Sequence, residues 1–343
     1  MLRTTVVFLF FLFSFQCAVA QSDTILNRYQ RHLLAGATVP ANSNELAASL
    51  NGNGQWSDID YQDKERGAWK PAIHLRRLRD LALAWANPAS SFYQQPSIRD
   101  AAGKALDHWI QKRYKCPNWW HNEIGVPQLM RDIIVLLQPA LSAQQREGAL
   151  EVFAQYKSNT NLTGANLTWT ADLGLHYGAL TRDLELIRKN RDLLTNEIKI
   201  TTEDGVQPDY SFHQHAKRLQ MFQYGGAFLI ENVRLAWELR GTALAFPKEK
   251  IDLLTDFVLN GWQWMARGIH TVPGTMDRSA SRKNAMHAAD IRPIIPYLID
   301  LVPEKRSEFN RIASHQNGNG ALNGFRSFPY SDFTAYQQDD FSF

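Results

Sequence analysis

The stretch VPQLMRDIIVLLQPAL, residues 126–141, decides the fold because its apolar residues recur at intervals of three and four. This spacing places them on one face of an α-helix with 3.6 residues per turn. The same spacing recurs along the chain in 73–86, 98–114, 142–156, 183–198, 225–241, 250–268 and 291–302. Strand-like alternation is nearly absent before residue 320. The sequence therefore predicts an all-α fold.

The segments between these helices carry the residues that end and begin helices. Asn87-Pro88, Gln138-Pro139, Gly241 and Pro247 fall at such positions. Many helices of ordinary length with short connections predict stacked antiparallel helical hairpins. An open solenoid and a closed toroid both satisfy this pattern, and no fixed-period repeat favours the solenoid.

Composition and charge exclude some classes of function. The chain has 343 residues, of which 44% are hydrophobic and 21% charged, which indicates one large globular domain or two smaller ones. The formal charge is only +3, and basic residues are scattered among acidic ones. We therefore expect no nucleic-acid partner, and any recognition of anions has to be local.

The first twenty residues, MLRTTVVFLFFLFSFQCAVA, have the composition of a secretory signal peptide. One arginine precedes an apolar run, and small residues precede Gln21. We expect a mature chain from about Gln21, secreted or periplasmic, with no membrane span. Cys17 would leave with the leader, so Cys116 would have no partner for an internal disulfide.

The C-terminal residues 316–343 differ from the helical part, 21–315. HQNGNGALNG from His315 has the composition of a loop, and aromatic and polar residues begin to alternate from Phe325 as in a strand. A lone hairpin is not stable in water. We therefore expect a linker and the first strands of a β domain that is not present in the sequence.

The stretch CPNWWHNEIGVP, residues 116–127, sets two adjacent tryptophans among polar residues. Neighbouring residues on a helix point about 100° apart, so Trp119 and Trp120 cannot both follow one narrow apolar stripe. At least one ring is expected to face a groove or solvent, as a stacking platform for a flat ligand such as a sugar ring. The alternative is a loop that buries both rings in the core.

A second set of polar residues lies in the loops that follow. TGANLTW carries Asn166, and DGVQPDYSFHQHAKRLQMFQYGG carries His213, His215 and Tyr224. Taken singly, Asn166 could be a helix N-cap and the histidines a polar helix start. On one continuous helix, the nine-residue separation of His215 and Tyr224 would turn them about 180° apart. If both serve one site, His215 has to lie on the loop or first turn and Tyr224 further along the helix.

Arg278 and Arg282 in PGTMDRSASR are four residues apart. Taken alone, they could form a solvated face. Like charges at this spacing oppose a helix by roughly 0.2–0.5 kcal/mol unless an anion lies between them. That anion could be Asp277, or a ligand carboxylate or sulfate, which the planar guanidinium binds through paired hydrogen bonds.

Metal and nucleotide sites are poorly supported. His213 and His215 could hold zinc from an extended loop, but no third ligand stands at a characteristic spacing. No phosphate-binding glycine loop occurs. We expect no cofactor and no metal.

NWWHNEIGVPQ, TGAN, the His215–Tyr224 spacing and the Arg278–Arg282 spacing, in this order on a helical chain, resemble the family eight polysaccharide lyases. This family comprises chondroitin AC, hyaluronate and xanthan lyases, and NWWHNEI looks most like the chondroitin AC lyases. The resemblance covers roughly Leu26 to the C-terminus. It implies an incomplete α/α toroid of antiparallel helical hairpins, here residues 21–315, followed by β-sandwich domains.

The resemblance also implies roles for individual residues. The catalytic centre would contain Asn166, His215, Tyr224, Arg278 and Arg282. The sugar chain would be positioned by Trp119 and Trp120, with Asn118 and Glu123 in the same segment. His213 has no counterpart, and the family's site includes a glutamate from the following β domain, beyond Phe343.

Elimination at a uronic acid requires loss of the weakly acidic C5 proton beside a carboxylate. Hydrogen bonds from Asn166, with help from arginine, would offset that charge and stabilise the enolate-like intermediate. A free tyrosine has a pKa near 10, so Tyr224 would need cationic neighbours to act as the base at neutral pH. It could then return the proton to the leaving oxygen. His215 is the rival base, and the residues leave both open.

We therefore expect a secreted lyase that cleaves chondroitin- or hyaluronan-type polysaccharides to 4,5-unsaturated uronate ends. The expected partner is an acidic polysaccharide, with no nucleic acid or membrane, and the expected state is a monomer. The alternatives are xanthan lyase-type specificity and a glycan-binding toroid without turnover because the β domain is missing. A further alternative is a hydrolase that uses two carboxylates among Glu123, Asp209 and Asp277.

Overall fold

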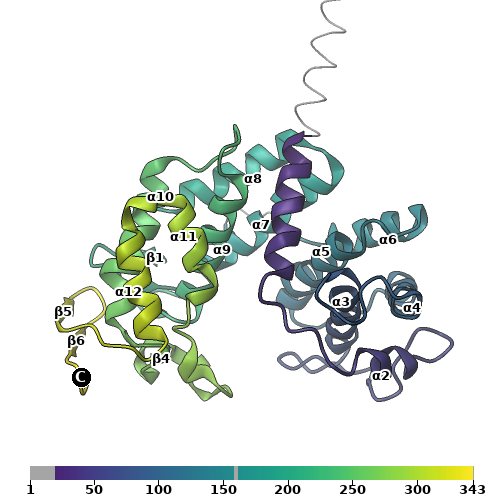
Figure 1. Ribbon diagram of the computed structural model, residues 1–343, viewed down its shortest axis with the longest axis horizontal. Coiled ribbons are helices and arrows are strands. Elements are labelled where there is room, and N and C mark those ends of the chain that lie inside the picture. Colours follow the sequence, from purple (N-terminus) through teal and green to yellow (C-terminus); the bar gives the residue numbers. More distant parts are fainter. Residues whose placement is uncertain (1–19, 158–160, 343) are drawn as a thin grey trace, which may run out of the picture. The chain divides into compact units, whose positions relative to one another are not determined.

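The computed structural model describes residues 20–157 and 161–342, which divide into two compact units (Figure 1). Unit 1 contains residues 20–157 and 173–187, and unit 2 contains residues 161–172 and 188–342. Helix α7 (Gly164–Thr181) begins in unit 2 and ends in unit 1. The predicted leader, except for Ala20, lies outside the described residues.

Unit 1 is built from consecutive helices that pack on one another. After a helical segment at 20–34, its main helices are α2 (Ser43–Ala48), α3 (Ala72–Ala86), α4 (Pro96–Lys112), α5 (Val126–Leu137) and α6 (Ala143–Phe153). Helix α3 packs against both α4 and α5, and α5 packs against α6. Leu75, Leu78 and Ala82 of α3 are fully buried, as their spacing on one helix face requires.

The helix boundaries in unit 1 follow local chemistry. Ser142 caps α6, since its hydroxyl accepts from the Gln145 N–H and the Gln145 side chain accepts from the Ser142 N–H. Helix α4 begins with Pro96, which lacks a backbone N–H and suits the first turn. It ends at Arg113, whose left-handed conformation stops the helix.

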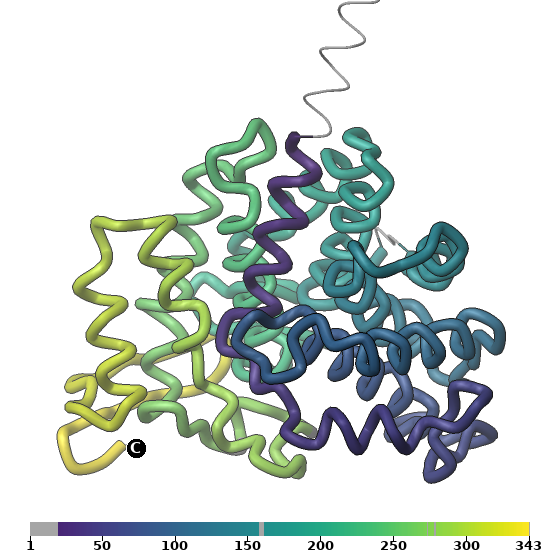
Figure 2. Tube along the Cα trace, turned by 45° about the vertical axis from the view of Figure 1, so that its right-hand side comes forward, coloured from purple at the N-terminus to yellow at the C-terminus, as the bar shows by residue number. Residues whose placement is uncertain are grey.

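Unit 2 holds the longest helix of the second half, α9 (Tyr224–Leu239). It also contains most of α8 (Leu184–Glu197), α10 (Lys248–Asp256), α11 (Ile295–Leu301) and α12 (Arg306–Gln316). Helix α9 packs on α10 and α11, where Trp237 stacks on Tyr297 with ring centres 4.3 Å apart. Figure 2 shows α11 and α12 side by side, joined at one end by residues 302–305.

Short antiparallel pairs interrupt the helices of unit 2. Strand β1 (Gly205–Val206) pairs with β2 (Phe212–His213), and β3 (Ala266–Arg267) pairs with β4 (His270–Thr271). The sequence did not predict these two-residue strands, which are too short to show alternation. They shape the loops that carry the candidate site.

The C-terminal segment forms a hairpin of β5 (Gly324–Phe328) and β6 (Phe333–Gln337), where the sequence predicts strands. Phe328 and Ala335 are buried, and Gln337 Nε2 donates to the carbonyl oxygens of Trp264 at 2.8 Å and Ala266 at 3.1 Å. The hairpin is therefore docked on the rest of unit 2. Whether it begins a larger β domain stays an expectation.

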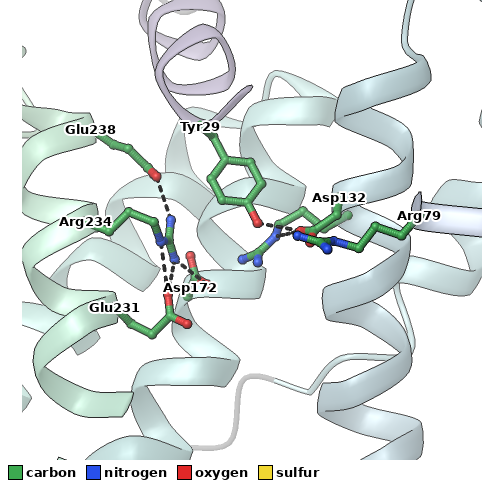
Figure 3. Close-up of polar contacts among 8 residues, drawn as sticks. Tyr29, Arg79, Asp132, Asp172, Glu231, Arg234 and Glu238 are labelled. Carbon is green, nitrogen blue, oxygen red and sulfur yellow. Dashed lines mark hydrogen bonds and ion pairs between the residues drawn. The ribbon is translucent and has the colours of Figure 1, made fainter. Parts of the chain in front are cut away.

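A buried arginine lies at the centre of the α9 packing in unit 2 (Figure 3). Arg234 pairs with Asp172 at 2.8 Å, with Glu231 at 2.6 Å and with Glu238 at 2.6 Å, and its side chain is only 1% exposed. Glu231 and Glu238 lie three residues before and four after Arg234, on the same helix face. Burial makes each of these charges dependent on its partners.

Unit 1 has the reverse arrangement, one buried carboxylate among cations (Figure 3). Asp132 accepts from Tyr29 Oη at 2.5 Å and from Arg79 Nε at 2.7 Å, and Arg131 Nε lies 3.3 Å away. Burial raises the pKa of Asp132, but Arg131, Arg79 and the Tyr29 hydroxyl outweigh it and the net pKa is lowered. Asp132 is therefore ionised in the core at neutral pH.

Within residues 20–157 and 161–342, we find no helix that combines the length and apolar character needed to cross a bilayer.

Candidate active site

The first turn of α9 positions the candidate base. Tyr224 is the first residue of the helix and is 7% exposed. A Cβ added to Gly225 would meet Phe212 Cγ at 3.0 Å, and one added to Gly226 would meet Trp262 at 3.3 Å. The glycine pair therefore lets the start of the helix lie close to these aromatic rings and fixes the position of Tyr224.

His215 lies directly against Tyr224. Their ring centres are 4.9 Å apart and their planes are nearly perpendicular, at 89°. His215 is exposed and stands on the loop after β2, where its φ of 62° is in the left-handed region. Its predicted loop position is confirmed. Tyr224 is the first helical residue, whereas we predicted a position further along the helix.

Asn166 is the third residue of α7 and not its N-cap, because the helix begins at Gly164. Its side chain is partly exposed, and no hydrogen bond of its amide is recorded among the described residues. The preceding residue, Ala165, donates its N–H to Gln214 Oε1 at 3.1 Å. The structure thus joins the segments that carry Asn166 and His215.

The two candidate arginines do not lie on an α-helix. The 3₁₀ turn Asp277–Ser281 precedes Arg282, which is extended and exposed. Among the described residues, Arg282 has no recorded ion pair, while Asp277 accepts from Gln220 Nε2 at 2.7 Å. The side chain of Arg278 lies outside the described residues. Repulsion across an α-helical turn therefore does not apply here, and Asp277 is engaged elsewhere.

His213 is buried and contacts the C-terminal hairpin. It is 3% exposed, its Nε2 is 2.9 Å from Ser331 Oγ, and burial lowers its pKa. Ser331 lies in the turn of the β5–β6 hairpin and donates to Ser211 Oγ at 2.6 Å. His213 therefore ties β2 to the hairpin. No group of three metal-binding side chains occurs in the parts of the chain that the structure describes.

The tryptophan pair belongs to unit 1, and its two rings differ. Trp119 is 45% exposed. The Trp120 ring is half-buried and packs over Gly125, where an added Cβ would lie 2.9 Å from it. One ring thus faces solvent, as expected, and the alternative of two core rings is wrong.

The neighbours of the tryptophans shape this segment. Asn118 Oδ1 accepts from the Trp120 N–H at 3.1 Å, and its Nδ2 donates to the Arg66 carbonyl at 3.0 Å. Glu123 lies 3.1 Å from Lys157 Nζ. A π-helical turn, His121–Gly125, follows and leads into α5. Such turns often occur at functional sites.

The carboxylates proposed for a hydrolase already have protein partners. Asp209 accepts from the Ser211 N–H at 2.9 Å and the Tyr330 N–H at 2.8 Å, while Asp277 and Glu123 have the partners named above. Asp209 therefore closes a turn.

Two neighbours of the site were missed from sequence. Trp169 contacts Tyr224 with ring centres 6.2 Å apart, and Gln214 bridges to the start of α7. Trp169 follows Asn166 by three residues, so a shared helix face could have indicated it. Gln214 is polar, yet 1% exposed, and no periodic pattern marks it.

Comparisons with known proteins agree with this architecture. A model of the N-terminal α-helical domain of polysaccharide lyase family 8 matches residues 18–315. Chondroitinase-AC of Pedobacter heparinus is 26% identical over 342 residues, 96% of this chain and 48% of that protein. Hyaluronate lyase of Thermasporomyces composti is 28% identical over 215 residues, 60% of this chain and 27% of that protein.

Solved structures give the same result for the fold. A chondroitinase AC lyase studied as oligosaccharide complexes superimposes with a TM-score of 0.86 at 23% identity, over 94% of this chain and 49% of that one. The Streptomyces coelicolor A3 chondroitin AC lyase gives 0.77 at 18% identity, over 92% and 52%. The expected all-α fold of the α/α-toroid type is thereby confirmed.

The chain spans about half the length of chondroitinase-AC, because the match covers 96% of this chain and 48% of that protein. The family model matches residues 18–315, which are most of this chain. The chain therefore belongs to polysaccharide lyase family 8 and contains that family's N-terminal α-helical domain.

Proposed function

We propose that unit 2 carries the reaction centre of a lyase that cleaves uronate-containing polysaccharides by β-elimination. The supporting observation is the contact of exposed His215 with buried Tyr224, whose ring centres are 4.9 Å apart. Two groups able to accept or donate a proton meet there, next to the segment that carries Asn166.

In this reaction a base removes the C5 proton, and the C5–H electrons delocalise into the neighbouring carboxylate. The C4–O bond then breaks, a C4=C5 double bond forms, and the leaving oxygen takes a proton. We assign proton removal and return to Tyr224, with His215 as the rival base. The Asn166 amide donates to the uronate carboxylate, where negative charge develops. We keep Arg278 in the proposed catalytic centre on the family resemblance alone.

Exposed basic side chains on unit 2 suit an acidic substrate. Lys217, Arg218, Arg282 and Lys283 are all exposed on unit 2. Arg218 forms a long ion pair, with its Nη1 3.7 Å from Asp277 Oδ2. Exposed cations attract a polyanion and raise its encounter rate, an effect that salt weakens.

On unit 1, Trp119 is the proposed contact for sugar rings. It is exposed next to a π-helical turn, and Asn118 holds the start of that helix. A flat ring with an apolar face can stack on such a side chain. Trp120 contributes less to sugar binding, because its ring is already packed on Gly125.

We assign the substrate to the chondroitin or hyaluronan class, and we assign the protein to a secreted or periplasmic location. The first assignment rests on relatives named chondroitinase-AC and hyaluronate lyase, and the second on the leader-like residues 1–20. A relative named xanthan lyase, from a Bacillus species, makes xanthan the necessary comparison substrate.

The test is the chemistry of the product. The full-length protein is incubated with chondroitin, hyaluronan and xanthan, and with dextran as the uncharged control. Elimination predicts an ultraviolet-absorbing conjugated uronate end and fragments whose masses sum to that of the substrate. Products that have gained one water per cleavage would show hydrolysis, and binding without cleavage of any uronate polymer would leave only a glycan-binding role.

A further inference from the structure

Asp204, at the turn between α8 and β1, lies between the two segments that carry the candidate site. Its carboxylate accepts three hydrogen bonds: from Thr163 Oγ1 at 2.9 Å, from Gln214 Nε2 at 2.7 Å and from the Ala216 N–H at 3.0 Å. Thr163 lies just before α7, while Gln214 and Ala216 flank His215. One side chain thus holds both segments.

Gln214 extends this connection into the interior. Its Nε2 donates to Asp204, while its Oε1 accepts from the Ala165 N–H at 3.1 Å, one residue before Asn166. Gly164 has a φ of 55°, which residues with a side chain rarely adopt, and a Cβ added there would lie 2.1 Å from Gln214 Oε1. The start of α7 is therefore packed tightly against the His215 loop.

The backbone at His215 is held in an unfavourable conformation. His215 has a φ of 62° and Ala216 a φ of 68°, two consecutive residues other than glycine in the left-handed region. Such residues persist only where surrounding contacts hold them. The hydrogen bond from the Ala216 N–H to Asp204 is such a contact.

We propose that Asp204 is a positioning residue for the elimination: through Gln214 and Ala216 it fixes the distance and orientation between Asn166 and His215. This inference rests on the proposed function of the same site. Asn166 has to meet the uronate carboxylate while Tyr224, with His215 against its ring, meets C5. Such groups tolerate displacements of only about 0.5 Å. Asp204 itself touches no reacting atom.

The first test is Asp204→Asn. The amide keeps the volume and one acceptor for the Ala216 N–H, but its NH₂ group cannot accept from Gln214. We expect kcat for unsaturated product to fall about tenfold or more while KM changes less than about threefold, because positioning is lost and the binding contacts remain. Glu203→Gln is the matched control, since it removes the exposed neighbouring carboxylate and is expected to leave kcat unchanged.

The second test reverses the polarity of one hydrogen bond. Gln214→Glu alone would set two carboxylates against each other and is expected to lower kcat. In the double variant Asp204→Asn with Gln214→Glu, the new amide donates to the new carboxylate, which can still accept from the Ala165 N–H. We expect kcat to recover to within about threefold of the parent, a coupling that unrelated loop damage would not give.

The third readout does not depend on activity. Protein labelled with ¹³C at histidine gives an NMR signal for His215, assigned by its loss in His215→Gln. Asp204→Asn is expected to shift this signal, and Glu203→Gln is not. An unchanged His215 signal, or Asp204→Asn with normal kcat, would overturn the positioning role. If the parent forms no unsaturated product but the signal shifts, the proposed function fails while the connection from Asp204 to His215 stands.

Discussion

Asn118–Glu123 of unit 1 and His213–Tyr224 of unit 2 both mix aromatic and polar residues, but they use them differently. In the first segment, Asn118 bonds to the backbone, Trp120 packs on Gly125, and only Trp119 is well exposed. In the second, exposed His215 rests on buried Tyr224 and on a strained backbone. A motif rich in functional residue types can therefore be largely scaffold. An exposed side chain held on a strained backbone and against a buried residue is a better indication of a catalytic site.

Trp120→Ala should give the largest effect and should act on stability. The ring is half-buried over Gly125, so its removal leaves a cavity and should lower the free energy of unfolding by about 3 kcal/mol, the lower end for a tryptophan. Chemical denaturation measures this. Glycan affinity of the folded fraction should be almost unchanged, and weaker binding at normal stability would instead make Trp120 a sugar contact.

Tyr224→Phe should act on turnover. The ring and its contacts with His215 and Trp169 remain, and only the hydroxyl is lost. A tyrosine base predicts a loss of about 10²-fold or more in kcat, about 2.7 kcal/mol, with substrate affinity nearly kept. Steady-state release of unsaturated product measures it. Near-normal turnover would leave His215 as the base.

Trp119→Ala should weaken glycan binding without destabilising the fold. By analogy with bases stacked on aromatic side chains, the expected loss is about 1–3 kcal/mol in binding. Trp119 is 45% exposed, so little packing is lost. Calorimetric titration with an oligosaccharide, alongside a thermal melt, separates the two effects. A large fall in melting temperature with unchanged affinity would contradict the platform.

The two units also differ in their histidines: His74 of unit 1 is fully buried, whereas His215 of unit 2 is exposed. Burial lowers the pKa of His74 to about 4, from an ordinary value of 6.5. The unfolded chain therefore binds this proton at higher pH than the folded chain. Its contribution to stability is present above pH 6.5 and is lost as pH falls toward 4.

The expected loss from His74 between pH 7 and pH 5.5 is about 1 kcal/mol in the free energy of unfolding. Urea unfolding at the two pH values measures it, with His74→Gln as the control that lacks a titrating ring. Equal pH dependence in the two proteins would show that His74 does not carry the effect.

The sequence predicts the helices well because apolar spacing is local, as in 126–141. It also predicts that His215 and Tyr224 can share a site only if His215 lies on the loop or first turn and Tyr224 further along the helix. The alternative of Asn166 as an N-cap is wrong, because the helix begins at Gly164, a glycine with a φ of 55° in the left-handed region, and an N-cap preference does not detect that conformation. It gives no sign of Asp204, whose three hydrogen bonds span 10 to 41 residues.

The partners of buried charges could not be predicted from the sequence either. Arg131 and Asp132 interrupt the apolar run of α5, and the contacts of Asp132 with Tyr29, Arg79 and Arg131 explain how the core accepts its charge. Along the chain, Tyr29 lies 103 residues from Asp132 and Arg79 lies 53 residues from it. Periodicity identifies the helix, and tertiary contacts decide which polar residues it can bury.

The most direct test of the central claim, that His215 and Tyr224 form one reaction centre, is the double variant His215→Ala with Tyr224→Phe. Because both groups act on one proton, we expect the double variant to lose little more turnover than the worse single variant. The rate of unsaturated product release is compared among the parent, both single variants and the double. A double variant whose loss equals the product of the two single losses would show that the residues act independently, and would contradict the account.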